Sequence, residues 1–133
     1  MFYHAKVKFD GQYWPVEFPD APGCVTFGHT KVQALERAKE ALEGWLESYV
    51  ENGESPPRPK TRKGGERIAV PAKLAFALRM RWAREELGLT QQALAKTTGL
   101  TQQQIARLEK RQGNPTLANL ATVADALGLE LVA

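Results

Sequence analysis

The most constraining feature of this sequence is the stretch Leu89–Glu109, whose pattern predicts two short helices joined at a glycine. Thr90 is a candidate N-cap of the first helix, because its hydroxyl can accept a hydrogen bond from a backbone N–H. Gly99 can adopt the left-handed conformation that ends a helix and turns the chain sharply. Thr101 and Gln104 have the spacing of a capping box at the start of the second helix. The stretch therefore predicts a compact pair of helices with a fixed turn.

The second helix, expected over 101–111, has polar side chains at its exposed start. Ile105 and Leu108 share an inner face, whereas Gln102 and Gln103 point outward. A plain helical hairpin does not need consecutive amides there. The arrangement resembles a helix-turn-helix of the phage-repressor type (Cro/CI, or XRE), whose second helix enters the major groove of DNA. From this resemblance we expect the DNA-contacting residues to be Gln91, Gln92, Thr101, Gln102, Gln103, Arg107 and Arg111.

Charge is distributed unevenly along the chain. Residues 1–52 carry five Lys and Arg against eight Asp and Glu, a net −3, and residues 53–133 carry thirteen against seven, a net +6. The basic part suits nucleic acid and the acidic part suits a basic partner. The sequence has neither a membrane-spanning apolar run nor a signal-peptide pattern. With Cys24 as its single cysteine and two histidines without metal-ligand spacing, we expect a cytoplasmic protein with no metal and no cofactor.

The N-terminal part has the pattern of strands followed by one long helix. Alternating apolar residues predict a strand over 2–9, and Asp10-Gly11 is a hairpin signal. Trp14, Val16 and Phe18 share one face of a second strand, and a short third strand is expected over 24–27. A capping box at Thr30 then opens a helix from Lys31 to about Tyr49. Its inner stripe is predicted to be Leu35, Ala38, Leu42, Trp45, Leu46 and Tyr49.

The opposite side of this long helix is acidic. Glu36, Glu40, Glu43, Glu47 and Glu51 fall on one ridge, called here the acidic ridge. A solvated helix face explains such a run of charge, and a docking surface for a basic partner explains it as well. We keep both interpretations at this point.

Composition changes after residue 52 and divides the chain into two domains. Residues 55–65 are rich in Pro, Gly, Lys and Arg and are expected to be linker-like. Residues 66–70 have the pattern of a fourth strand whose pairing the sequence leaves open. We therefore expect domains at 1–70 and 71–133, an α+β arrangement. In the second domain the predicted inner stripes are Phe76, Met80, Ala83 and Leu87 in the first helix, and Leu117, Leu120, Val123, Ala124 and Leu127 in the last. The apolar tail 129–133 is a candidate dimer contact.

Three groups of residues in the N-terminal part resemble the HicB antitoxin domain. They are Asp10-Gly11-x-Tyr13-Trp14, then Val16-Glu17-Phe18-Pro19-Asp20-x-Pro22-Gly23-Cys24-x-Thr26-x-Gly28-x-Thr30, then Ala34-x-x-x-Ala38-x-Glu40-Ala41-Leu42-x-x-Trp45-Leu46. The resemblance implies a partial RNase H-like fold of strands and one helix. It also implies that this domain masks a HicA-like toxin, a small basic ribonuclease that cuts mRNA with a catalytic histidine, and that the helix-turn-helix domain represses the shared operon.

The residues themselves argue against catalysis. Two-metal nuclease chemistry needs several carboxylates that converge on one site. Asp10 and Asp20 lie in predicted turns, Glu17 points away from the apolar face, and the acids of the long helix face away from the sheet. We therefore expect no catalytic residues and no enzyme activity.

Two functions compete at this stage. The first is an antitoxin that also represses its own operon, and the second is a transcriptional regulator whose N-terminal domain senses a small ligand. For the antitoxin, the expected partners are a HicA-like toxin and an inverted-repeat operator bound by a homodimer or a larger homo-oligomer. Arg84 and Glu109 occupy positions where repressor-type domains carry a partly buried ion pair, so the resemblance implies that this pair stabilises the DNA-binding domain. The toxin-binding candidates are Trp14, Glu36, Glu40, Glu43 and Glu47.

Overall fold

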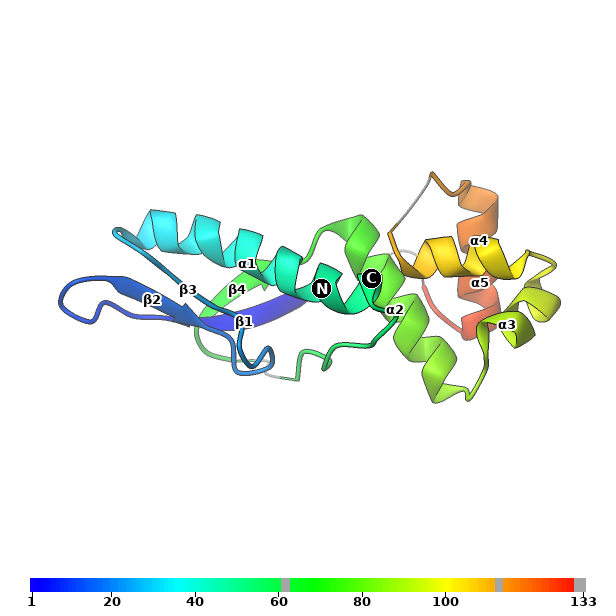
Figure 1. Ribbon diagram of the computed structural model, residues 1–133, viewed down its shortest axis with the longest axis horizontal. Coiled ribbons are helices and arrows are strands. Elements are labelled where there is room, and N and C mark those ends of the chain that lie inside the picture. Colours follow the sequence, from blue (N-terminus) through cyan, green and yellow to red (C-terminus); the bar gives the residue numbers. More distant parts are fainter. Residues whose placement is uncertain (61–62, 112–113, 131–133) are drawn as a thin grey trace. The chain divides into compact units, whose positions relative to one another are not determined.

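A computed structural model describes residues 1–60, 63–111 and 114–130 of the chain (Figure 1). The described chain divides into two compact units, Met1–Ala72 and Lys73–Ala133. The first contains an antiparallel sheet and one helix, and the second is helical, so the α+β class expected from the sequence is confirmed.

The sheet of the first unit has four strands in the order β3-β2-β1-β4. They are β1 (Phe2–Val7), β2 (Trp14–Glu17), β3 (Val25–Gly28) and β4 (Glu66–Ala69), and each neighbouring pair is antiparallel. The hairpin predicted between the first two strands is present, because the Asp10 N–H donates to the Tyr13 carbonyl (3.0 Å) and the Asp10 carboxylate accepts from two backbone N–H groups. These bonds, that of Tyr13 first, hold the pKa of Asp10 below its ordinary value.

Two strand boundaries differ from the prediction. The first strand ends at Val7 rather than at residue 9, so Phe9 lies outside the ladder and is 49% exposed. The third strand is shifted by one residue and includes Gly28, which pairs with Trp14. A Cβ at Gly28 would overlap the backbone of Ala34, so this glycine is where the helix comes closest to the sheet.

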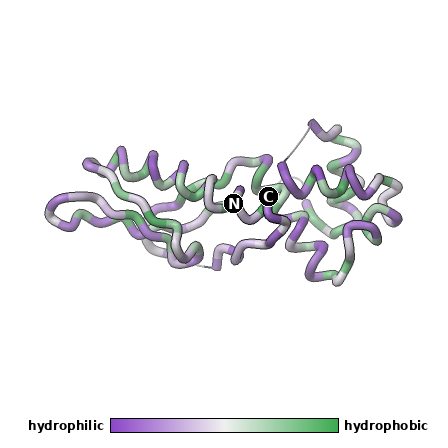
Figure 2. The backbone as a smooth tube through the Cα atoms, in the orientation of Figure 1, coloured by the Kyte–Doolittle hydropathy of each residue, from purple (hydrophilic) through white to green (hydrophobic). Residues whose placement is uncertain are grey.

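Helix α1 (Lys31–Glu51) packs across one face of the sheet (Figure 1). Figure 2 shows hydrophilic and hydrophobic residues alternating along it. The buried line runs at intervals of four residues, whereas the predicted Leu35, Trp45 and Tyr49 are only half-buried at its sides. The inner stripe was therefore predicted partly wrong, because the buried line also includes Ala34 and Val50 and leaves the three larger residues at its margins. The buried residues are Ala34, Ala38, Leu42, Leu46 and Val50.

The segment predicted to be linker-like belongs to the first unit. It connects α1 to β4, and β4 pairs with β1 in the register Tyr3↔Ile68. The buried Tyr3 hydroxyl donates to the Pro57 carbonyl (2.8 Å), and the Lys60 N–H donates to the Asp20 carboxylate (2.9 Å). Burial raises the pKa of Tyr3 well above its ordinary range. Composition alone missed these contacts, since they involve backbone groups rather than apolar side chains.

The second unit is built from helices around one apolar core. The helices are α2 (Ala72–Glu86), α3 (Gln91–Thr98), α4 (Gln102–Glu109) and α5 (Leu117–Leu127). Two inner positions of the prediction are wrong: Leu87 lies beyond the end of α2 and is 56% exposed, and Leu117 in the first turn of α5 is 73% exposed. Leu129 packs partly against the core, and residues 131–133 of the proposed dimer tail lie outside the described residues. The core consists of Met80, Ala83, Leu94, Ala95, Ile105, Leu108, Val123 and Leu127.

Within the described residues, no helix is long and apolar enough to cross a membrane. The same residues contain no group of three or more His, Cys, Asp or Glu side chains that is able to hold a metal ion.

Candidate nucleic-acid interface

The caps predicted for α3 and α4 are all present. The Thr90 hydroxyl accepts from the Ala93 N–H (3.0 Å), and Gly99 has a left-handed φ of 75°. The Thr101 hydroxyl accepts from the Gln104 N–H (3.1 Å), and the Gln104 side chain accepts from the Thr101 N–H (2.9 Å). This reciprocal capping box fixes where α4 begins and therefore where its first side chains project.

The first turn of α4 presents its polar residues to solvent. Thr101, Gln102 and Gln103 are exposed, while Ile105 and Leu108 behind them are buried in the core. Gln92 and Arg107 are also exposed, and Gln91 and Arg111 are half-buried. An exposed amide at the start of such a helix can bond the edge of an adenine bidentately. The structure thus gives α4 an outer face of hydrogen-bonding groups and an inner face that holds it in place.

A buried ion pair joins α2 to the end of α4. Glu109 is fully buried, and its carboxylate accepts from Arg84 Nε (2.6 Å) and Nη2 (2.9 Å). Arg84 Nη1 donates to the Leu89 carbonyl (2.7 Å). The hydrogen bonds that Arg84 donates to Glu109 raise the pKa of Arg84. The ion pair expected from the sequence is confirmed, and its paired geometry is that of a strong, charge-assisted contact.

Gln91 links this ion pair to the exposed end of α4. Its side-chain amide donates to Glu109 Oε1 (3.2 Å), and its carbonyl oxygen accepts from Gln102 Nε2 (2.8 Å). The sequence suggested Gln91 as a phosphate contact, and that role stays a prediction. The structure adds a second role, because a chain of polar contacts from Glu109 orients the Gln102 amide.

Sequence reasoning missed Arg81, a second buried cation beside Glu109. Arg81 Nη1 lies 3.8 Å from Glu109 Oε1, and Arg81 Nε lies 3.4 Å from the Glu85 carboxylate. Arg81 precedes Arg84 by three residues, so both lie on the same side of α2. The three-residue spacing is visible in the sequence, but it does not show whether Arg81 is buried or exposed. Only the structure shows that Arg81 is buried beside Glu109.

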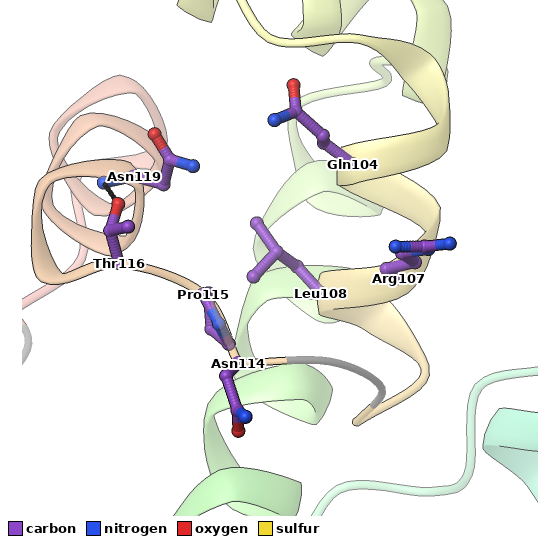
Figure 3. A pocket seen from close by; sticks show the side chains of 7 residues that line it. All are labelled: Gln104, Arg107, Leu108, Asn114, Pro115, Thr116 and Asn119. Atoms are coloured by element: carbon purple, nitrogen blue, oxygen red, sulfur yellow. Dashed lines mark hydrogen bonds between the residues drawn. The ribbon is translucent and has the colours of Figure 1, made fainter.

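A depression of about 170 Å³ lies between α4 and the start of α5. Figure 3 shows Leu108 pointing toward Thr116, with Arg107 projecting away from α5. The Thr116 hydroxyl caps α5 by accepting from the Asn119 N–H (3.1 Å). Asn114 and Asn119 line this depression together with Gln104 and Arg107 of α4, so polar groups from the start of α5 adjoin that helix.

Arg111 follows α4 in a strained conformation. Lys110 is the C-cap, and Arg111 has a φ of 59°, the left-handed region that a side chain disfavours. We expect Arg111→Gly to stabilise the second unit by about 0.5–1 kcal/mol, the relief of strain less the backbone entropy of glycine. Hydrogen exchange of the α4 amides measures the gain. Arg111→Ala removes the same charge without relieving the strain, so equal stability of the two variants would contradict this explanation.

The toxin-binding candidates of the first unit lie on different surfaces. Trp14 is half-buried on the helix-covered side, with its ring 5.4 Å from that of Phe9. On α1, Glu36 and Glu40 are exposed, and Glu43 and Glu47 are half-buried. These glutamates and Trp14 are therefore not brought together by any contact that the structure shows.

Comparisons with known proteins cover both units. A family model described as a HicB-like antitoxin of a bacterial toxin-antitoxin system matches residues 3–66, and a helix-turn-helix model matches residues 80–133. The "Antitoxin HicB 2" of Photorhabdus laumondii is 33% identical, over 100% of this chain and 96% of that protein. The chain belongs to the HicB antitoxin family. "Antitoxin HicB" of Escherichia coli is 33% identical over 87% of this chain and 85% of its own.

The two family models and the HicB relatives confirm the resemblances to HicB and to an XRE-type helix-turn-helix. The chain is also similar to a solved structure, the restriction-modification controller protein C.AhdI from Aeromonas hydrophila. The two are 36% identical, the match covers 42% of this chain and 85% of that one, and the TM-score is 0.40.

Proposed function

We propose that this HicB protein neutralises a HicA-like toxin by direct binding and represses transcription of its own operon. The toxin is assigned to the Met1–Ala72 unit and the operator to the Lys73–Ala133 unit. Family membership supports the antitoxin role, and the exposed first turn of α4 carries the DNA-binding role. Gln102 and Gln103 stand there on a helix fixed by a capping box and by the core behind it.

The proposed DNA contacts differ in what they read. Gln103 is exposed and is assigned to a base edge in the major groove. Gln102 shares this turn, already oriented by Gln91. Arg107 lies one turn later and is exposed, so its guanidinium is assigned to phosphate. Gln92, Thr101 and Arg111 complete the proposed surface. One such unit binds weakly, so we infer that a homodimer reads an inverted repeat.

The base-reading assignment is tested by comparing Gln103→Ala with Arg107→Ala. We expect Gln103→Ala to lose about 1–3 kcal/mol of binding free energy for the operator and to discriminate less between operator and other sequences. Arg107→Ala should weaken binding to all DNA and lower the slope of log affinity against log salt by about one. Fluorescence anisotropy with operator and scrambled duplexes over a salt series measures both effects. A Gln103→Ala variant that keeps its full preference for the operator would remove Gln103 from the reading surface.

A small-ligand sensor fits the first unit less well. A depression of about 620 Å³ lies on the sheet, but it is open to solvent and exposed charged residues (Lys6, Lys8 and Glu17) form part of its lining. Ligand pockets in proteins enclose most of the ligand. We therefore assign this unit to a protein partner. Co-purification with a HicA-like protein whose catalytic histidine is replaced tests that assignment directly.

A further inference from the structure

Three aromatic rings gather where β3 passes into α1. The Tyr13 and Phe27 centroids are 5.1 Å apart, those of Tyr13 and His29 are 5.4 Å apart, and those of Phe27 and His29 are 6.0 Å apart. Each pair meets edge to face, which is a favourable geometry for aromatic rings. Figure 1 shows that the β1–β2 and β3–α1 connections lie at the same end of the sheet. We call Tyr13, Phe27, His29 and the adjoining Arg37 the aromatic patch.

Arg37 ties the aromatic patch to α1. Its guanidinium carbon lies 5.6 Å from the centroid of the Phe27 ring, and its Nη1 donates to the Phe27 carbonyl (3.0 Å). β3 is an edge strand, and an edge strand usually offers its backbone groups to a pairing strand. Because Arg37 already occupies the Phe27 carbonyl, strand addition at this point is obstructed. A partner is therefore expected to dock through side chains.

The aromatic patch remains accessible although its rings contact one another. Phe27 is 45% exposed, and Val25, which projects to the same face of β3, is 66% exposed. Contiguous exposed apolar surface of this kind marks interaction sites. Tyrosine and arginine are enriched among the residues that dominate binding energy, and rings already held by neighbours lose little freedom on binding. The patch thus has the composition of an interface centre.

Charge identifies the kind of partner. Glu40 follows Arg37 by three residues on α1, and Glu36 precedes it directly; both glutamates are exposed. They begin the acidic ridge, so an apolar centre is bordered by negative charge, as in the core and rim of a protein interface. Such a border attracts a basic protein and repels nucleic acid. A HicA-like toxin, which must be basic to hold RNA, has the complementary charge.

We propose that the aromatic patch is the centre of the toxin-docking surface, with Glu36 and Glu40 as its acidic rim. This inference rests on the proposed function and refines it. The proposed centre of toxin binding is therefore not Trp14, whose ring packs against Phe9, but the end of β3 that leads into α1. The acidic ridge guides the approach of the toxin, while the patch holds the bound toxin.

The test measures binding of the full-length chain to a HicA-like toxin with its catalytic histidine replaced. Phe27→Ala is expected to weaken affinity about 10- to 100-fold, mostly through faster dissociation. Reversing Glu36 and Glu40 together to lysine is expected to slow association, most strongly at low salt. Phe2→Ala is a matched control, because Phe2 is also exposed (41%) and has Arg67 stacked 4.0 Å from its ring centroid. This control should bind as the unaltered chain does.

The outcomes separate the two proposals. Failure of the unaltered chain to bind the toxin would contradict the proposed function itself. If that chain binds, but Phe27→Ala binds equally well or Phe2→Ala loses as much, the docking surface is wrong and the antitoxin role stands. Sedimentation of the free variants measures self-association. If Phe27→Ala alters self-association but leaves toxin affinity intact, the patch is a contact between copies of this chain and not the toxin-docking surface.

Discussion

Replacing Glu109 with alanine is expected to lower the free energy of unfolding of the second unit by about 3–5 kcal/mol. The carboxylate is fully buried and satisfies Arg84 through two hydrogen bonds. Its removal takes away the carboxylate that both buried arginines, Arg84 and Arg81, approach. The cost therefore comes from cations that are buried without their counter-ion, and it exceeds the net value of the ion pair itself.

The same change is expected to weaken DNA binding as a secondary effect. Without Glu109, the Gln91 amide loses the acceptor that holds it, and Gln102 loses a fixed partner at the start of α4. Hydrogen exchange of the α3 and α4 amides in the full chain measures stability, and operator affinity is measured at a temperature where the variant is folded. Lost binding with unchanged protection would show instead that Glu109 acts mainly at the DNA surface.

A double variant supplies the control. Arg84→Leu with Glu109→Leu removes both charges and fills the site with apolar volume, so it should be more stable than either single variant. Glu109→Leu alone leaves both buried arginines without this carboxylate, and Arg84→Leu alone leaves the buried carboxylate without its hydrogen-bonded partner. A double variant as unstable as the sum of the single ones would mean that the two side chains do not interact energetically, and the explanation by unpaired charge would be wrong.

The elements of this protein that follow from local chemistry were predictable from its sequence. The caps at Thr90 and Thr101 and the left-handed Gly99 appear as expected, because each depends on residues close in sequence. The pair of Arg84 and Glu109, 25 residues apart, was expected only from the resemblance to repressor-type domains. Hydrophobic periodicity was less informative at the ends of elements. It predicted that Leu87 is buried, but α2 ends at Glu86, so Leu87 no longer follows the helical spacing and is exposed.

Features that depend on distant contacts were not predictable. The β4 strand pairs with β1 across more than half the length of the unit, a pairing that the sequence left open. In the DNA-binding surface, the sequence placed Gln91 and Gln102 at helix starts but gave no distance between their amides. The aromatic patch was also hidden, because Tyr13, Phe27 and Arg37 come from a turn, a strand and a helix. Their contacts exist only after the sheet has formed.

The second large effect is expected from Gly65→Ala, at the entry to β4. Gly65 has a left-handed φ of 68°, and a Cβ there would overlap the carbonyl oxygen of Ala5 in β1. The left-handed conformation costs an alanine about 1–2 kcal/mol, and forcing β1 and β4 apart adds about 1–3 kcal/mol by analogy with overpacking. We therefore expect the free energy of unfolding of the first unit to fall by about 2–5 kcal/mol, because β4 cannot keep its register with β1.

Gly64→Ala separates these two contributions. Gly64 has a similar φ of 82°, but a Cβ there would meet no atom within 4 Å. The Gly64→Ala variant should lose only the stability that the left-handed conformation costs an alanine. The difference in stability between the two variants therefore measures the cost of the close approach of Gly65 to β1. Hydrogen exchange of the β4 amides in the full chain is the measurement, with the α4 amides as an internal reference that should not change. Equal losses at Gly64 and Gly65 would show that the approach to Ala5 relaxes without cost, and that β4 is held by its side chains, such as the buried Ile68, rather than by this turn.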